Sequence, residues 1–316
     1  MDSNDTKASG IQQQLEAPME ILRLEGLSKR YGNIQAVNGL DLRILKGQVY
    51  GLLGPNGSGK TTTLGIILGI LRQTSGNYFW FGKPSEATVY TRIGSLLERP
   101  NFYPYLSAVN NLEIIALIRG VDKADIEAVL HLVDLYPRRN HKVQTFSYGM
   151  KQRLALASAL LGEPEVLILD EPTNGLDPEG IFEIRNIIGK VASTGTTVLL
   201  ASHLLDEVQK VCTHVAILHR GIKKFSGPVD ELLSEGETLE LSATDLKALE
   251  NVVIKLPEYL SHKIKNQMIE LKVNGKTDAA AINQFLHQNG VSCSHLSIHK
   301  QSLEQNFLEL LQKSSS

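Results

Sequence analysis

Alternating and continuous apolar segments follow one another along the first two thirds of the chain. Residues 21–24 and 40–44 alternate between apolar and polar side chains, which predicts strands with one buried face. The run 166–169 is apolar throughout, as expected for a central parallel strand that is covered on both faces. Further apolar, aromatic or β-branched segments predict strands at residues 49–53, 76–82, 93–98, 196–202 and 215–218.

Strand character disappears between about residues 107 and 161. Residues 111–119 and 123–135 instead carry apolar side chains at helical spacing. Helices inserted between the strands of an α/β core predict a helical subdomain.

The pattern changes again beyond about residue 236. Residues 268–273 alternate cleanly and precede Asn274 and Gly275, a turn signal. Further strands are predicted at residues 239–242 and 294–298, and helices at residues 245–253, 279–287 and 303–311. We expect a polar tail over residues 1–18, an α/β domain over residues 19–236 and a small ferredoxin-like α+β accessory domain over residues 237–316. The accessory domain carries no chemical constellation, so a regulatory or interface role is expected, with simple packing support as the alternative.

Composition and charge exclude several classes of protein. Hydrophobic residues make up 42% of the chain and charged residues 21%, which is ordinary for a globular protein. The formal net charge of −2 provides no general attraction to nucleic-acid phosphates. The two cysteines, Cys212 and Cys293, predict reduced thiols rather than a disulfide framework or a metal site. No segment approaches the ~18 consecutive apolar residues of a membrane-spanning helix, and the N-terminus lacks a secretory signal. A membrane role is therefore expected to come through a partner.

One stretch matches a phosphate-binding pattern completely. The pattern G-x-x-x-x-G-K-[ST] is filled by Gly54, Pro55, Asn56, Gly57, Ser58, Gly59, Lys60 and Thr61, between a buried strand and the start of a helix. Loop amides and the helix N-terminus can hold an anion there. Lys60 would reach the outer phosphates, and Thr61 would ligate Mg²⁺. The alternative is a glycine-rich turn without a ligand.

Asp170 and Glu171 follow the apolar run 166–169, at the end of the strand where open α/β sheets bind ligands. Two adjacent carboxylates are costly there unless they serve a metal, a proton transfer or an ion pair. One can ligate Mg²⁺ while its neighbour, pointing the other way along the extended chain, orients a water. The alternative is a strand end that meets solvent.

Two further side chains are candidates for contacts with a nucleotide. His203 is expected to open the helix after the strand 196–202, where it could touch a γ-phosphate, although a structural or surface role is the alternative. Tyr31 is expected on an exposed connection, where it could stack on a base. Its alternative is a partly buried edge tyrosine. The aromatic loop of Phe102, Tyr103 and Tyr105 is an interface candidate.

Residues 146–155, with the sequence Phe-Ser-Tyr-Gly-Met-Lys-Gln-Arg-Leu-Ala, narrow these possibilities. They resemble the signature motif of ABC ATPases, in which a Ser-Gly loop opens a helix before the acidic pair. Residues 170–178 resemble the acidic strand end of that family and the loop after it. The motifs stand in family order over about residues 21–235. The resemblance implies a P-loop ABC ATPase domain with its helical subdomain at about residues 105–162.

The resemblance also implies a role for each matching residue. Glu171 would polarise the attacking water, Asp170 would hold the metal, and His203 would be the switch histidine. ATP would be bound by Tyr31, by residues Gly54 to Thr61 named above, and by Thr62. Ser147 and Gly149 would contact the γ-phosphate bound by the other protomer, and Asp177 would lie in the loop that crosses the dimer interface. Hydrolysis of ATP with Mg²⁺ would then need a head-to-tail homodimer or pseudo-dimer.

Two departures from the family pattern stand out. The signature loop, usually Ser-Gly-Gly-Gln, carries Tyr148 and Met150 at its second and fourth positions. Glu98 replaces a glutamine that senses the metal and the water; it can ligate Mg²⁺ but cannot donate a hydrogen bond while ionised. Both departures resemble the branch of ABC ATPases from bacitracin- and lantibiotic-resistance exporters, which often carries a short C-terminal domain.

The leading hypothesis is the ATPase subunit of an ABC exporter, peripheral at the cytoplasmic face of the membrane and paired with a separate transmembrane permease. The aromatic loop and the helical subdomain would dock that permease. A soluble ABC ATPase acting on nucleic acid or ribosomes is the alternative, but the chain lacks the tandem cassettes, coiled-coil insertions and basic tails of such proteins, so no nucleic-acid partner is expected. A non-catalytic nucleotide-binding regulator is a third hypothesis, which the presence of Glu171 and His203 disfavours.

Overall fold

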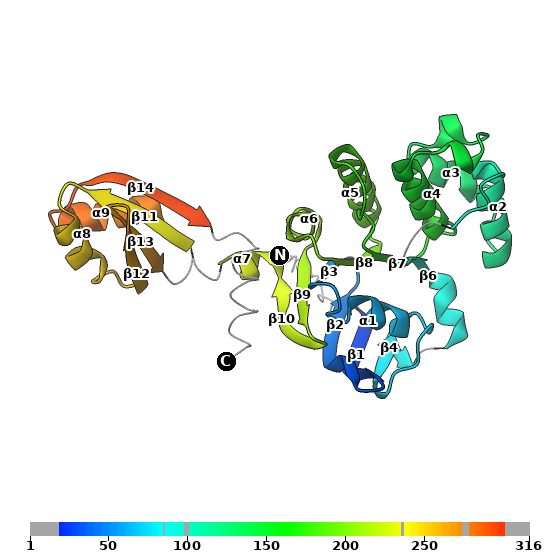
Figure 1. Ribbon diagram of the computed structural model, residues 1–316, viewed down its shortest axis with the longest axis horizontal. Helices are drawn as coiled ribbons and strands as arrows, with labels where there is room; N and C mark the ends of the chain where they lie inside the picture. Colours follow the sequence, from blue (N-terminus) through cyan, green and yellow to red (C-terminus); the bar gives the residue numbers. More distant parts are fainter. Residues whose placement is uncertain (1–18, 85, 98–100, 235–236, 274–277, 301–316) are drawn as a thin grey trace, which may run out of the picture.

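The computed structural model describes residues 19–84, 86–97, 101–234, 237–273 and 278–300. The expected tail over residues 1–18, the helix expected at 303–311 and the candidate ligand Glu98 lie outside the described residues. The described chain forms three sheets, which Figure 1 shows with the helices beside them.

The strands and helices of the described residues have the following bounds. The strands are β1 (Glu20–Tyr31), β2 (Ile34–Leu45), β3 (Val49–Leu53), β4 (Ser75–Trp80), β5 (Lys83–Pro84), β6 (Ile93–Leu96), β7 (Val166–Asp170), β8 (Thr197–Ser202), β9 (His214–His219), β10 (Ile222–Pro228), β11 (Glu237–Ala243), β12 (Tyr259–Lys265), β13 (Met268–Val273) and β14 (Cys293–Lys300). The α-helices are α1 (Lys60–Ile67), α2 (Ala108–Arg119), α3 (Asp125–Leu132), α4 (Tyr148–Leu160), α5 (Pro178–Ser193), α6 (Leu205–Val211), α7 (Val229–Ser234), α8 (Leu246–Val253) and α9 (Ala279–Gln288). Short 3₁₀ helices are η1 (Ala87–Arg92), η2 (Tyr136–Arg138) and η3 (Val143–Thr145).

The central sheet has the strand order β10-β9-β3-β8-β7-β6. The strands from β9 to β6 are parallel, and β10 pairs antiparallel with β9. Along β7, Ile168 faces the core that contains α1 and the second sheet, whereas Leu167 and Leu169 face the core that contains α4, α5 and α6. This burial on two faces explains why residues 166–169 are apolar throughout and confirms the predicted central strand.

The second sheet is antiparallel, with the order β2-β1-β4-β5. Strand β1 continues to Tyr31, well beyond the predicted residues 21–24. Register shifts between Leu24 and Arg30 break the alternation of apolar and polar positions. The sequence pattern therefore revealed only the first part of this strand.

Helices α2, α3 and α4 lie between β6 and β7 in the chain and form one group at the β6 side of the central sheet (Figure 1). Leu112, Leu130 and Leu154 bring one buried side chain from each of these helices into a common core. The predicted helical segment is thereby confirmed.

The third sheet is antiparallel, with the order β12-β13-β11-β14. With α8 and α9 it gives the chain order β-α-β-β-α-β and encloses a separate core. Strand β12 was not predicted from the sequence, because most of its positions are exposed and carry no alternating pattern. Of the helices in the described residues, none combines the length and the apolar character needed to cross a bilayer.

Candidate active site

The glycine-rich loop connects β3 to α1 and lies close to the backbone of two other strands. Gly59 has a φ of 104°, and a Cβ at this position would stand 2.4 Å from the carbonyl oxygen of Ala36 in β2. A Cβ on Gly54 would stand 2.3 Å from the carbonyl oxygen of Leu218 in β9. Only glycine permits this path at both positions.

Lys60, the first residue of α1, is held inside the loop. Its side chain is only 6% exposed, and Nζ donates to the carbonyl oxygen of Gly54 at 2.7 Å. The hydroxyl of Ser58 is buried and has no hydrogen-bond partner in the described part of the chain. An inward cation and a buried hydroxyl without a partner fit a bound polyanion, which would offer acceptors to both.

Glu171 lies between Lys60 and His203. Its Oε1 is 3.4 Å from Lys60 Nζ, and its Oε2 is 2.8 Å from His203 Nδ1. Strand β7 ends at Asp170, and Glu171 has a φ of 48°, a left-handed conformation that is uncommon and costly for residues other than glycine. The expectation that Glu171 continues the extended chain is therefore wrong, because the backbone turns out of the strand at this residue and directs the carboxylate toward the loop.

His203 does not open a helix as expected, since α6 begins only at Leu205. It lies in the connection after β8, where its backbone N–H also points to Glu171 Oε2 at 3.4 Å. Because β8 lies between β3 and β7 in the sheet, the ends of these strands bring Lys60, Glu171 and His203 together.

Thr61 and Asp170 supply the oxygen ligands that a magnesium ion prefers. Thr61 is exposed at the start of α1, and Asp170 is buried at the end of β7. The donor set therefore fits the expected cation at the same edge of the sheet.

Tyr31 ends β1 with its side chain 44% exposed. Lys29 Nζ lies 4.9 Å from the centre of the ring. Tyr31 is thus partly buried, as in the alternative, and it still leaves aromatic surface accessible, so stacking on a base stays a prediction.

The signature residues gather in a separate cavity of about 480 Å³. Ser147 caps α4 by accepting a hydrogen bond from the amide of Met150 at 3.2 Å, and Asp177 caps α5 in the same way with the amide of Gly180 at 2.9 Å. Gly149 also lines this cavity. Among the described residues that line this cavity, none comes from the group of Lys60, Thr61, Glu171 and His203.

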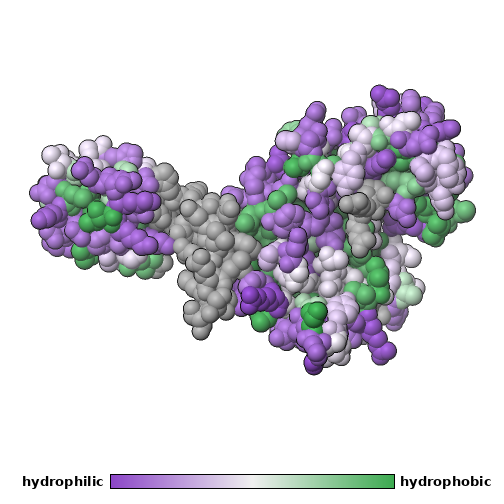
Figure 2. All heavy atoms as spheres, viewed as in Figure 1, coloured by the Kyte–Doolittle hydropathy of each residue, from purple (hydrophilic) through white to green (hydrophobic). Residues whose placement is uncertain are grey.

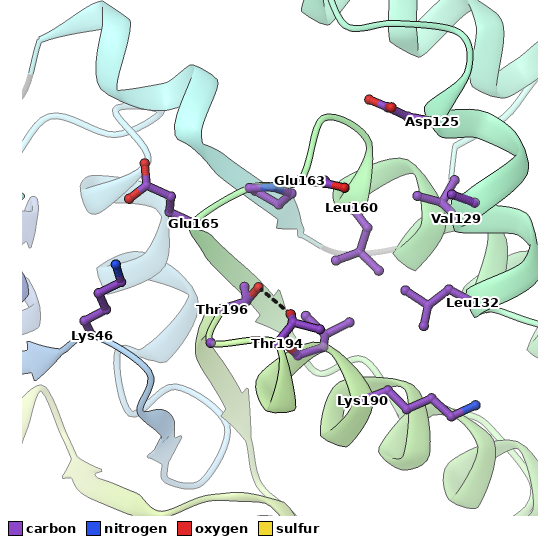
Figure 3. Close-up of a pocket in the computed structure, with 14 residues that line it drawn as sticks. Lys46, Asp125, Val129, Leu132, Leu160, Glu163, Glu165, Lys190, Thr194 and Thr196 are labelled. Atoms are coloured by element: carbon purple, nitrogen blue, oxygen red, sulfur yellow. Dashed lines mark hydrogen bonds between the residues drawn. The ribbon is translucent and has the colours of Figure 1, made fainter.

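A second cavity of about 480 Å³ lies at the opposite edge of the central sheet (Figure 3). Figure 3 shows Val129, Leu132 and Leu160 on one side of it and Glu165, just before β7, on the other. A hydrogen bond from Arg92 lowers the pKa of Glu165, so this carboxylate serves an ion pair. Because Glu165 and Thr196 directly precede β7 and β8, the cavity lies at the amino ends of these strands, whereas the candidate phosphate site lies at their carboxyl ends.

Comparison with known proteins decides the family. A family model described as ABC transporter matches residues 37–174. The bacitracin transport ATP-binding protein BcrA of Bacillus licheniformis is 36% identical over 297 residues, which cover 92% of this chain and 97% of that protein. The chain belongs to the ABC transporter family. It is an ATP-binding subunit, and its hydrolysis of ATP is coupled to transport.

Other members of the ABC transporter family agree with this assignment. The lantibiotic transport ATP-binding protein SrtF of Streptococcus pyogenes is 40% identical over 201 residues, covering 64% of this chain and 88% of that protein. The solved structure of cbiO1 from Clostridium perfringens, part of an ABC transporter complex, has a TM-score of 0.63 at 27% identity and covers 76% of this chain and 96% of its own. A solved dimeric bacterial ABC transporter cassette has a TM-score of 0.60 at 25% identity and covers 66% and 99% of the two chains. These relatives confirm the α/β ATPase fold and favour a transporter over an ATPase that acts on nucleic acid.

Proposed function

We propose that two copies of this chain hydrolyse ATP in composite sites and thereby power export through a separate membrane subunit at the cytoplasmic face of the membrane. One observation carries the proposal: the chain presents the phosphate-binding residues and the signature residues on two different surfaces. We infer that a single chain does not place both sets on one nucleotide. A second copy in head-to-tail orientation would bring Ser147 and Gly149 to the nucleotide held by Lys60.

Each residue of the composite site has a task that suits its chemistry. Lys60 and the loop amides bind the outer phosphates. Glu171 orients the attacking water and accepts its proton. His203, 2.8 Å from that carboxylate, holds it in place and contacts the γ-phosphate. The hydroxyl of Ser147 accepts from the backbone with its oxygen, which leaves its hydrogen to donate to a phosphate. Tyr31 stacks on the adenine.

The magnesium ion would be held by Thr61 and Asp170, with Glu98 as a further ligand. When bound, it neutralises the charge that develops on the phosphate oxygens. Asp177 keeps the loop after Glu171 in place by capping α5, at the surface expected to meet the second copy.

Contact with the membrane subunit would use the aromatic loop. Tyr103 and Tyr105 are 51% and 61% exposed, and their ring centres lie 5.9 Å apart. Leu117 and Ile118, near the other end of α2, are also exposed, and Figure 2 shows apolar surface at the outer edge of the molecule where α2 lies. Exposed apolar surface of this kind favours a protein interface. An exporter is supported by relatives named for bacitracin and lantibiotic transport. Residues 237–316 would form a ferredoxin-like accessory domain.

The substitution Glu171→Gln tests the catalytic part of the proposal. It keeps the size of the side chain but removes the base, so steady-state turnover falls by about 100-fold or more while ATP still binds. ATP should then hold the variant as a dimer in size-exclusion chromatography. The exposed Glu127→Gln on α3 is the matched control and should keep wild-type turnover. Turnover of Glu171→Gln within about twofold of wild type would exclude Glu171 as the base.

Co-purification from membranes tests the transport part. A multi-span membrane protein should be recovered with the wild-type chain, and its recovery should fall when Tyr103 and Tyr105 are both replaced by serine. Recovery with ribosomes or DNA alone would reject the exporter proposal.

A further inference from the structure

The loop over residues 136–142, which we call the basic loop, is joined to the aromatic loop over residues 101–107. The amide of Val143 donates to the carbonyl oxygen of Leu106 at 2.9 Å, and that of Gln144 donates to Pro104 at 2.9 Å. Lys142 also forms an isolated β-bridge with Ser107. The two loops therefore present one continuous surface, although helices α2 and α3 separate them in the chain.

This joined surface carries charge of a single sign. Residues 101–112 contain no charged side chain, and residues 135–150 contain Arg138, Arg139 and Lys142 but no carboxylate. The chain as a whole has a formal net charge of −2, so the sign of the charge on this surface is opposite to that of the whole chain. Such a local field attracts anions more strongly than the net charge suggests.

Contacts within the basic loop and with α3 hold it in place. The ring of Tyr136 stacks on His131 at 3.9 Å, and the guanidinium of Arg139 lies 4.1 Å from the centre of the same ring. Arg139 also donates to the carbonyl oxygen of Tyr136 at 3.1 Å. The side chains of Arg138 and Lys142 remain exposed on this fixed backbone, so they are available to a partner.

We propose that the basic loop binds the anionic headgroups of phospholipids next to the membrane subunit. This inference rests on the proposed function, which places the adjacent aromatic loop against the membrane subunit. The cytoplasmic leaflet attracts surface lysines and arginines. The cytoplasmic loops of membrane proteins are themselves rich in lysine and arginine, so they would repel the basic loop. Exposed tyrosines beside the cations suit the level of the headgroups, where tyrosine is enriched.

Co-sedimentation with vesicles tests the inference. The full-length chain is mixed with vesicles of phosphatidylcholine alone or of phosphatidylcholine with phosphatidylglycerol, at low and at high salt. We expect binding to the mixed vesicles only, and we expect salt to weaken it. The double variant Arg138→Gln/Lys142→Gln should bind about thirtyfold more weakly, since each cation near an anionic surface contributes separately. Arg139 is kept because it also supports Tyr136.

The matched control removes exposed lysines from another surface, in the variant Lys247→Gln/Lys255→Gln. It should bind the mixed vesicles like the wild type, and all variants should bind ATP equally, which shows that they are folded. An equal loss in the control, or no preference of the wild type for mixed vesicles, would overturn the inference. The wild type could instead bind single-stranded RNA more tightly than the mixed vesicles, and the double variant could lose this binding. That result would overturn the inference, because the ligand of the basic loop would then be a nucleic acid and not a lipid. If the membrane subunit co-purifies with the chain but the chain does not bind vesicles, only the lipid contact is refuted. If the chain binds vesicles but no membrane subunit co-purifies with it, the proposed function is refuted.

Discussion

Backbone geometry at single residues explains much of the nucleotide site. Gly59 and Glu171 both have positive φ angles, and both lie where the chain leaves a strand of the central sheet or enters the helix after it. Gly59 accepts this conformation without cost, whereas Glu171 accepts it at a cost that the fold has to compensate. In return, the carboxylate lies within reach of both Lys60 and His203.

Gly59→Ala should abolish most ATP binding. The substitution combines a left-handed backbone with a Cβ that would stand 2.4 Å from the carbonyl oxygen of Ala36, so the loop has to move away from β2. We expect the dissociation constant, measured by calorimetric titration with ATP, to rise at least about tenfold. Gly47→Ala is the matched control, since Gly47 has a φ of 77° but a Cβ there would meet no atom within 4 Å. Equal losses of affinity in the two variants would show that backbone strain, and not the close approach, is decisive.

The two thiols should react at different rates. Burial raises the pKa of Cys212 to about 12, and it also raises the pKa of Cys293, which is less buried. Because a raised pKa means less thiolate, both react slowly at pH 8, and Cys212 reacts more slowly because it is also less accessible to the reagent. Alkylation followed by mass spectrometry should modify Cys293 first in the native chain. In denaturant we expect similar rates for the two thiols. In the native chain we expect labelling to become faster as the pH rises toward the pKa of each thiol.

At the scale of elements, local sequence patterns predicted those strands, helices and loops whose structure depends on a single segment of the chain. The phosphate loop, the apolar run of β7 and the helices α8 and α9 were predicted from short stretches of sequence. The course of β1 beyond Leu24 did not, because its bulges destroy the two-residue period. Strand β12 was missed because it lies at the edge of its sheet and is mostly exposed. The contact of Glu171 with Lys60 and His203 depends on three strands that are distant in the chain, and only their order in the sheet fixes it.

Asn111 supports the aromatic loop, although no sequence pattern singles this residue out. Its buried amide accepts from the backbone N–H of Tyr103 at 2.8 Å and donates to the carbonyl oxygens of Tyr103 and Ser107 at 3.1 and 2.9 Å. Asn111→Leu should lower the free energy of unfolding by about 2–4 kcal/mol, because backbone groups near the core lose their partners. Urea unfolding measures this loss. The exposed neighbour in Asn110→Leu should change stability by less than about 0.5 kcal/mol, and a similar loss there would contradict the supporting role of Asn111.

At the scale of the molecule, the described chain divides its apolar residues among three cores. Two of them share the central sheet, one on each face, so they depend on each other. The third consists only of residues from the third sheet, its two helices and the connections between them, between Leu239 and Ile298. A core that uses no side chain of the nucleotide-binding part is the mark of a unit that can fold by itself.

A chain that ends at residue 236 should therefore fold and bind ATP with the affinity of the full chain. Its heat-induced unfolding, followed by calorimetry, should lose one transition relative to the full chain, because two independent cores unfold as two cooperative units. The temperature of the remaining transition should shift by only a few degrees, since no side chain of the two large cores is removed. A truncated chain that precipitates, or that binds ATP at least about tenfold more weakly, would show that the third sheet is part of the nucleotide-binding unit. The truncated chain could keep its ATPase rate when it is alone and show a changed rate once the membrane subunit is present. That result would assign the third sheet to regulation or to contact with that subunit.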